Sequence, residues 1–246
     1  MKIEQATSTT ITQLWADALP RIKQAQYLEQ AAQTLAEALH TQFSDSVVVA
    51  RIFLTVPFGD LPKSNKEFVQ NLTNSAGAAD TLTTACPVLS LIGTHGQEAD
   101  WCDRRKSKGH VGIPLISADF VGAIPMISRL LKEFGVPLDF LDSHDPDVLI
   151  ETIGKKTGLF FVEDAAKATD AQGRKIIAAQ DFVSDHNVKS VFGIGGAYDN
   201  GRLFVIVVFC RDAFSRTTAE DFLTLATLFQ SQTNGLASSG NIFING

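Results

Sequence analysis

One short segment of the chain, from Trp101 to His110, concentrates side chains that can bind ligands or react. Its sequence, WCDRRKSKGH, holds four basic groups, a histidine, a thiol and an indole. Because a guanidinium group can donate two parallel hydrogen bonds to a carboxylate or phosphate, the segment is typical of an anion-recognising lid over a pocket. The other interpretation is an exposed loop whose arginines pair with Glu98, Asp100 or Asp103.

A second polar position follows the apolar residues of the phrase FFVED, residues 160–164. Glu163 or Asp164 could accept a hydrogen bond inside a pocket, or could belong to a turn at the end of a strand. We predict no catalytic residue. The predicted ligand-binding set contains seven residues: Trp101, Cys102, Asp103, Arg104, Arg105, His110 and Glu163.

The spacing of histidine and cysteine does not favour a metal centre. His95, Cys102 and His110 lack the close pairs typical of zinc-binding sequences, so we predict no metal site. A bilin chromophore would require a thiol near a pocket histidine, and Cys102 with His110 offers only part of that arrangement. The sequence leaves the identity of any cofactor open.

The overall charge argues against one class of partner. With 246 residues, a formal net charge of −6 and a pI near 5.3, the chain lacks the basic face that binds nucleic-acid phosphates. Residues 1–20 show no signal-peptide pattern, and no apolar run reaches the ~18 residues of a membrane span. Three cysteines without paired spacing are typical of reduced thiols. We expect a cytoplasmic protein with neither nucleic-acid nor membrane partners.

The last third of the chain indicates most clearly the elements that position these groups. Asn200-Gly201 lies between two apolar runs and predicts an antiparallel hairpin with a type I′ turn. Seven consecutive apolar residues, 203–209, cannot alternate between core and water, so this strand must be central and covered on both faces. Thr217 and Glu220 form a capping-box pattern that predicts a helix over 218–232.

The first third predicts a helical layer followed by a strand. Residues 1–9 are polar and are expected to be a mobile end. A helix that begins at Ile11 should end before Pro20, because proline lacks the backbone donor of a helix interior. Apolar residues at helical spacing predict a helix over 27–43, and a β-branched run predicts the first strand over 47–56.

The middle of the chain is less regular. Residues 62–84 are polar and short of large apolar side chains. Ser117 is the expected cap of a helical stretch that Pro125 kinks or divides and Gly135 ends. The remaining expected elements are an amphipathic piece at 148–153 and strands at 88–92, 159–162, 176–179 and 191–194.

In this order, the elements and several phrases of the sequence resemble GAF domains. The phrases are FFVEDA, AAQDFVSDHNVKSVFGIGG, NGRLFVIVVF and FSRTTAEDFLTLA, together with LIGTHGQEADWCDRRKSKGH and IPMISRLLKEFGV. The resemblance covers roughly residues 28–234. It implies an α/β fold of the α+β type, in which terminal helices cover one face of a central antiparallel sheet. A helical and loop elaboration would cover the other face, over a ligand pocket.

The resemblance also implies a domain organisation and a function. The expected parts are an N-terminal extension (1–26), a GAF-like domain (27–234) with an insertion at about 60–155, and a C-terminal tail (235–246). The expected function is that of a non-enzymatic sensory and regulatory domain of bacterial signalling proteins, which binds a small molecule of unknown identity. It would act through a homodimer or a signalling output protein. No kinase, cyclase or DNA-binding sequence follows Gln232, so that output would come from a partner or from sequence outside this chain.

Two other functions stay open. One GAF subgroup reduces free methionine sulfoxide with loop cysteines, and Cys86 and Cys102 lie in the corresponding region, although the tryptophan-containing strand motif of that subgroup is missing. The second is a protein-interaction scaffold. A homodimer would use two apolar helix stripes, which could instead pack on the sheet: Leu28, Leu35, Leu39, Phe222, Leu225 and Phe229.

Overall fold

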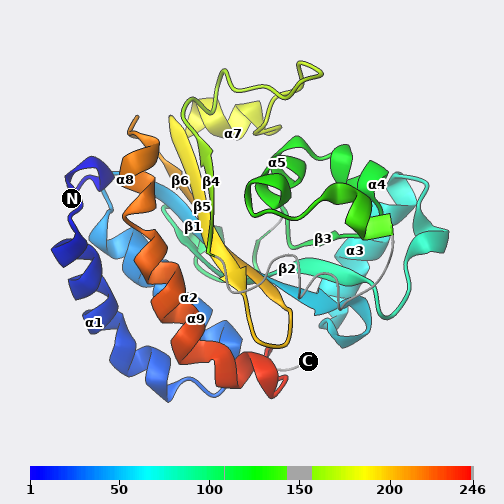
Figure 1. Ribbon diagram of the computed structural model, residues 1–246, viewed down its shortest axis with the longest axis horizontal. Helices are drawn as coiled ribbons and strands as arrows, with labels where there is room; N and C mark the ends of the chain where they lie inside the picture. The colour runs from blue at the N-terminus through cyan, green and yellow to red at the C-terminus, as the bar shows by residue number, and fades with distance from the viewer. Residues whose placement is uncertain (108, 143–156, 245–246) are drawn as a thin grey trace.

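Figure 1 shows the computed structural model of the protein, which describes residues 1–107, 109–142 and 157–244. In these residues one antiparallel sheet has the strand order β3-β2-β1-β6-β5-β4. Its strands are β1 (Val47–Pro57), β2 (Pro87–Gly96), β3 (Gly112–Pro114), β4 (Gly158–Val162), β5 (Ser190–Ala197) and β6 (Leu203–Cys210). The expected α+β fold with a central antiparallel sheet is confirmed. The amphipathic piece predicted at 148–153 lies outside the described residues.

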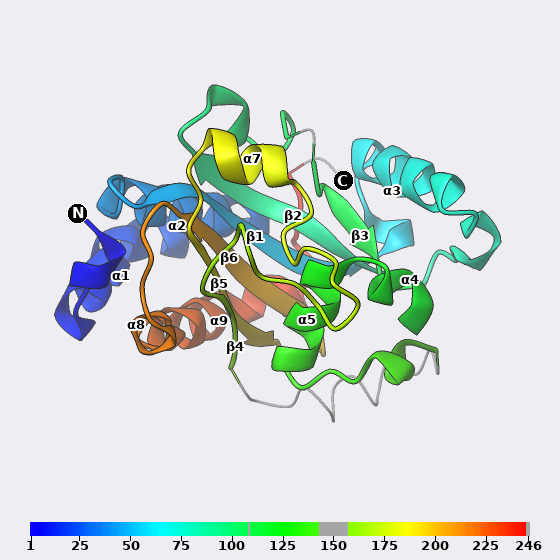
Figure 2. The same ribbon diagram turned by 90° about the horizontal axis from the view of Figure 1, so that it is seen from above.

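Helices cover both faces of this sheet (Figures 1 and 2). One face carries α1 (Ser8–Gln24), α2 (Leu28–Gln42), α8 (Arg216–Glu220) and α9 (Leu223–Ser238). The other carries α4 (Ala118–Gly122), α5 (Pro125–Glu133) and α7 (Gln180–Asp185). Helix α3 (Lys63–Ser75) packs beside β3. None of the described helices is long and apolar enough to cross a membrane.

The central strands β1 and β6 are buried on both faces, as the apolar run 203–209 predicts. On β1, Ala50, Ile52 and Leu54 belong to the core beneath α1, α2 and α9. The alternate residues Val49 and Phe53 belong to the core on the opposite face. This division follows from the two-residue period of a strand, so one strand supplies side chains to both cores.

Helix α2 comes very close to the backbone of β2 at Gly93. A Cβ atom at Gly93 would lie 2.6 Å from the carbonyl carbon of Ala32, so only glycine allows this approach. The Gln33 amide nitrogen donates to the Thr94 carbonyl oxygen at 2.9 Å, and its oxygen accepts from the Thr94 N–H at 3.2 Å. The close packing and the amide pair together hold α2 on this strand.

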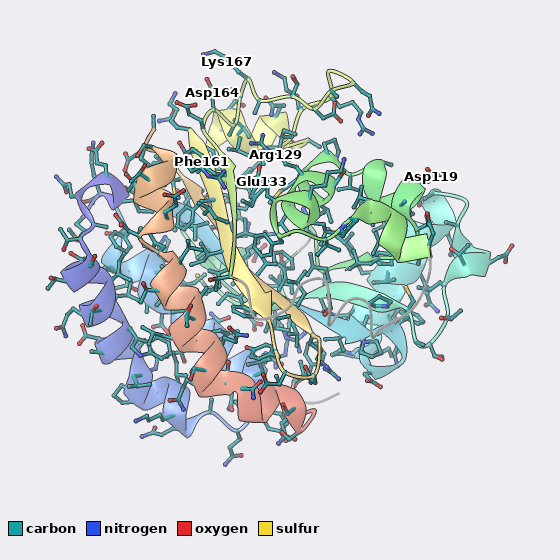
Figure 3. The ribbon with its side chains drawn as sticks, viewed as in Figure 1. Asp119, Arg129, Glu133, Phe161, Asp164 and Lys167 are labelled. Atoms are coloured by element: carbon teal, nitrogen blue, oxygen red, sulfur yellow. The ribbon has the colours of Figure 1, made fainter. Side chains whose placement is uncertain are left out.

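Helix α5 is tied to the edge strand β4 by Arg129 and Glu133, which Figure 3 labels together with Phe161. Arg129 donates to the Phe161 carbonyl oxygen at 2.8 Å, and Glu133 accepts from the Phe161 N–H at 3.1 Å. Arg129 and Glu133 also pair with each other at 2.7 Å. These bonds occupy backbone groups that an edge strand would otherwise offer to another chain, and they hold α5 beside the sheet.

Two expectations for the N-terminal part are wrong. Ile3 is fully buried and its N–H donates to the Ser46 hydroxyl at 2.9 Å, so Ile3 anchors the segment 1–9 on the core, although most of its other residues are exposed. Helix α1 continues through Pro20 to Gln24. Pro20 lies on the exposed side of α1, and the buried residues Trp15 and Ile22 pack the helix on the core before and after it.

The C-terminal elements are confirmed, with differences in their turns. Strands β5 and β6 pair as expected. In the turn between them, only Gly201 has a positive φ, of 77°, and the Tyr198 N–H donates to the Arg202 carbonyl oxygen, which closes a loop longer than two residues. The type I′ turn is therefore wrong. Ser215, not Thr217, caps the first turn, and the predicted helix is divided into α8 and α9.

The middle of the chain contains both confirmed and wrong predictions. Ser117 caps α4, and the helical stretch is divided at Pro125, as expected. The irregular stretch at 62–84 instead includes α3. Residues 176–179 form no strand, because Ile176 and Ile177 bury their side chains in the same core instead of alternating between two faces.

Replacing Gly93 with alanine should lower the free energy of unfolding by roughly 3 kcal/mol, because the added Cβ would force α2 off β2. Gly235 is the matched control, since it lies inside α9 with nothing within 4 Å of an added Cβ. Gly235→Ala should raise the free energy of unfolding by up to ~1 kcal/mol. Urea denaturation measures both, and equal effects of the two variants would contradict the close docking of α2.

Candidate functional site

Two cavities among the described residues differ in character and lie on opposite sides of the sheet. The first is polar, has a volume of about 360 Å³ and lies between α2 and the loop that follows β2; we call it the α2 groove. The second is apolar, has a volume of about 150 Å³ and lies between the other face of the sheet and α5; we call it the sheet cavity. The seven residues predicted from the sequence are not brought together in either one.

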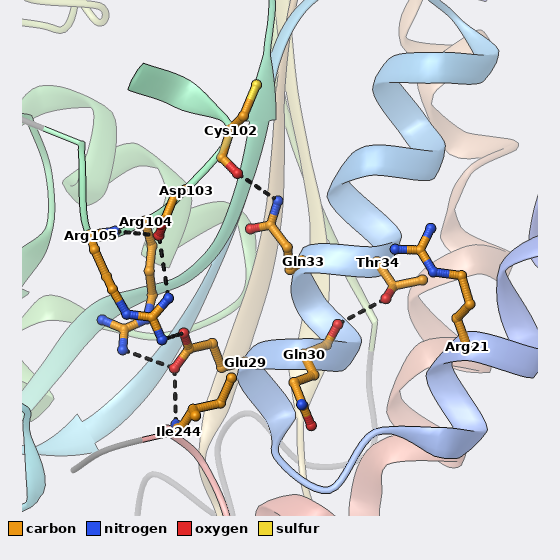
Figure 4. Close-up of a pocket in the computed structure, with 10 residues that line it drawn as sticks. All are labelled: Arg21, Glu29, Gln30, Gln33, Thr34, Cys102, Asp103, Arg104, Arg105 and Ile244. Atoms are coloured by element: carbon orange, nitrogen blue, oxygen red, sulfur yellow. Dashed lines mark hydrogen bonds and ion pairs between the residues drawn. The ribbon is translucent and has the colours of Figure 1, made fainter. Parts of the chain in front are cut away.

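The α2 groove receives four of those seven residues (Figure 4). Its lining consists of Arg21, Glu29, Gln30, Gln33, Thr34, Cys102, Asp103, Arg104, Arg105 and Ile244. The groove therefore contains Arg104 and Arg105, the two arginines that the sequence predicts to bind an anion.

Both arginines are already paired with Glu29, a residue that the sequence did not single out. Arg104 donates to one Glu29 carboxylate oxygen at 2.8 Å, and Arg105 donates to the other at 2.6 Å. Arg104 and Glu29 are each about 5% exposed, and the Arg104 guanidinium lies 4.8 Å from the centre of the Phe243 ring. Arg105 also pairs with Asp103 at 3.5 Å. The Arg105–Asp103 pair is one of those that the alternative interpretation of the sequence predicts. An external anion could bind the two arginines only by displacing Glu29.

The C-terminal residues complete this cluster. The backbone N–H of Ile244 donates to Glu29 at 3.1 Å. The carbonyl oxygens of Asn241 and Ile242 accept from the N–H groups of Leu28 and Glu29 at 2.8 and 2.9 Å. These bonds satisfy two free donors at the start of α2. The Glu29 cluster thus joins three segments that are distant in the sequence: the start of α2, the loop after β2 and the C-terminal residues. Its role is structural.

Glu29→Gln should lower the free energy of unfolding by about 3 kcal/mol or more, because it leaves the buried Arg104 charge without its carboxylate. Asp103→Asn is the control. Its ion pair with Arg105 is exposed, so the change should cost less than ~1 kcal/mol. Thermal and urea denaturation of both variants test this. If Glu29→Gln were no more destabilising than Asp103→Asn, the cluster would not hold these segments together.

The two thiols of the reductase alternative lie at opposite ends of β2. Cys86 immediately precedes this ten-residue strand and Cys102 follows it, so they are roughly 30 Å apart, too far for a disulfide. Burial raises the pKa of Cys86 to about 11. Cys102 lies 4.0 Å from His95, but burial lowers the pKa of His95, so at neutral pH that ring supplies no charge to stabilise a thiolate. Within the described ranges, no three His, Cys, Asp or Glu side chains are placed to hold a metal ion.

The sheet cavity is built on the two central strands. Val49, Arg51 and Phe53 of β1 stand opposite Phe209, Val207 and Val205 of β6 in register, and all six side chains form its floor. The remaining walls come from β2, β3, the loop at 109–110, α5 and the segment before and within α7. These wall residues are Leu89, Gly109, His110, Ile113, Ile124, Pro125, Met126, Ile127, Leu130, Ile176, Ile177, Ala178, Ala179 and Phe182.

Arg51 is the functional candidate that our sequence reasoning missed. Its guanidinium Nη1 donates to the Gly109 carbonyl oxygen at 2.9 Å, while its buried Nε has no hydrogen-bond partner. Burial lowers the pKa of Arg51 to about 10, so the side chain is still charged at neutral pH. One signal could have found it, because Arg51 is the single charged residue in the apolar run 47–57.

His110 stands at the mouth of the same cavity and is the predicted residue that the structure places there. It has a positive φ of 52°, an uncommon conformation for a residue other than glycine. Desolvation and the nearby charge of Arg51 lower the pKa of His110. Although the residue as a whole is exposed, its ring is therefore neutral at neutral pH.

Trp101 and Glu163 line neither cavity. The Trp101 ring packs against Phe182 and His186 of the α7 region, with ring centroids 5.6 and 4.8 Å apart. Glu163 is exposed at the end of β4, and its carbonyl oxygen accepts from the Ser190 hydroxyl at 3.0 Å. Both contacts are structural. Glu163 lies in the turn at the end of a strand, which is the second of the two positions considered for it from the sequence.

No protein-family model matches the sequence, and no curated protein matches it. Solved GAF domains do match the structure. A chain described as the structure of the GAF domain is 12% identical, covers 94% of this chain and 92% of its own, and has a TM-score of 0.50. The chain has a GAF-like fold. The GAF domain of an Acinetobacter phosphoenolpyruvate-protein phosphotransferase, 14% identical, covers 94% of this chain and 98% of its own with a TM-score of 0.48. The GAF domain of a Coxiella burnetii phosphoenolpyruvate-protein phosphotransferase is 12% identical, covers 96% of this chain and 99% of its own, and has a TM-score of 0.48. At these identities the likeness concerns the fold, which confirms the resemblance seen in the sequence.

Proposed function

We propose that this GAF-like protein is a non-enzymatic sensory domain that binds a small molecule in the sheet cavity. The observation that carries the proposal is an apolar cavity whose floor is the centre of the sheet and whose described lining has two polar side chains, those of Arg51 and His110. Small-molecule sites typically combine an apolar wall with a few placed polar groups. The volume of about 150 Å³ suits a compact molecule, since a cavity of that size can hold benzene.

The roof of the cavity offers a route by which a bound molecule would be sensed. Helix α5 forms part of the roof and is tied to β4 through Glu133. The same Glu133 pairs with Arg216 of α8 at 3.3 Å, and Arg216 donates to the Leu159 carbonyl oxygen at 3.2 Å. A ligand that favours the docked position of α5 would therefore bias α8 and the helix α9 that follows it.

We assign the other candidate residues to supporting roles. Arg104 and Arg105 join the start of α2 to the C-terminal residues, and Trp101 packs on α7. His110 stays in the proposed binding site. In this proposal, residues 27–234 remain one domain with an insertion at about 60–155, and the flanking segments pack on it.

The output of the domain is proposed to be a signalling partner or a second copy, in the cytoplasm of a bacterium. The helix stripes considered for dimerisation are at most 1% exposed within one chain, because they pack on the sheet and on neighbouring helices. A partner would therefore contact the outer faces of α1, α2 or α9.

The cavity can be tested by filling it with a larger side chain. Met126 is half-buried and lines the cavity, whereas Lys132 is exposed on the same helix and does not. Benzamide, a neutral compact probe, should shift the methyl NMR signals of cavity residues such as Ile177 and Val207 in the unmodified protein. Met126→Trp should abolish these shifts and Lys132→Trp should preserve them. Absence of shifts in the unmodified protein with both benzamide and benzoate, or equal shifts in both variants, would contradict the proposed site.

A further inference from the structure

Arg51 occupies the centre of the cavity floor, where an apolar residue is expected. Val49 and Phe53 flank it on the same face of β1, and Val207 lies directly opposite on β6. A guanidinium group placed among such side chains loses hydration, and this loss costs free energy unless an anion pairs with it. The position of Arg51 therefore calls for a negatively charged partner.

The described part of the chain does not provide that partner. The Gly109 carbonyl oxygen is its one hydrogen-bond acceptor there, and no carboxylate in the described residues forms an ion pair with Arg51. Arg104 and Arg129 differ in this respect, because each pairs with a carboxylate, of Glu29 and Glu133 respectively. The charge of Arg51 is thus left for an occupant of the cavity.

The cavity limits what that occupant can be. Among the described lining residues, Arg51 supplies one positive charge and His110, the other polar side chain, is neutral, so these residues balance one negative charge. A phosphate monoester carries nearly two negative charges at pH 7 and needs more donors than this lining holds. A volume of about 150 Å³ excludes large ligands and suits one ring or a short branched chain.

We infer that the sheet cavity recognises a small monocarboxylate with a compact apolar body, and that Arg51 binds its carboxylate. This inference rests on the proposed function. The apolar body packs on the floor and beneath α5, and the planar guanidinium matches the carboxylate geometry. The neutral His110 ring at the cavity mouth can donate a further hydrogen bond.

Isothermal titration calorimetry with matched probes tests the inference. The probes are benzoate and benzamide, and 3-methylbutanoate and 3-methylbutanamide, which differ within each pair in charge. The unmodified protein should bind each carboxylate at least tenfold more tightly than its amide. Arg51→Met should weaken carboxylate binding at least tenfold and change amide binding less than threefold, while Arg51→Lys should retain part of the preference. Circular dichroism confirms that each variant is folded.

The Arg105→Met variant provides the matched control, because Arg105 is half-exposed in the α2 groove on the other side of the sheet. It should leave carboxylate affinity unchanged. If Arg105→Met rather than Arg51→Met removes binding, the anion site is the α2 groove and the inference is overturned. It is also overturned if the unmodified protein binds carboxylate and amide equally, although the cavity itself would then stand. Failure of all four probes to bind would overturn both the inference and the proposed cavity.

Discussion

The burial of β1 and β6 on both faces is the constraint on which the rest of the structure depends. Neither strand has a face exposed to water, so their alternating side chains must serve two separate cores. One set packs under α1, α2 and α9. The other set forms the floor of the sheet cavity. The single charged residue in that second set, Arg51, is half-buried, and its charge among apolar side chains makes this strand position the proposed binding position.

The most charged segment of the chain has a different role from the one its composition indicates. The arginines after β2 are held by Glu29, and Glu29 also binds the backbone of the C-terminal segment. A buried carboxylate with three donors fixes the relative positions of the segments that supply them, because any rearrangement would leave a charge unpaired. The charged loop after β2 therefore holds segments of the chain together, and Arg51, the single charged residue of an apolar strand, belongs to the candidate site.

Local patterns predicted much of the fold. The seven-residue apolar run gave a central strand, and the periodicity of residues 27–43 gave α2, because both depend on which faces are buried. Other features depend on partners far away in the sequence. Ile3 is buried by contacts such as its bond to Ser46, and α1 continues through Pro20 because packed residues lie on both sides of it. No spacing rule connects Glu29 with Arg104, since 75 positions separate them. Arg51 was visible in the sequence as the one charge in its strand, but only the register of β1 against β6 shows that it faces a cavity.

A crystal structure of the protein with 4-bromobenzoate, phased at the bromine absorption edge, tests the central claim most directly. The account predicts a bromine peak inside the sheet cavity, beneath α5, with the carboxylate within hydrogen-bonding distance of the Arg51 guanidinium. A carboxylate bound at Arg104 and Arg105 in the α2 groove, with the sheet cavity empty, would contradict it.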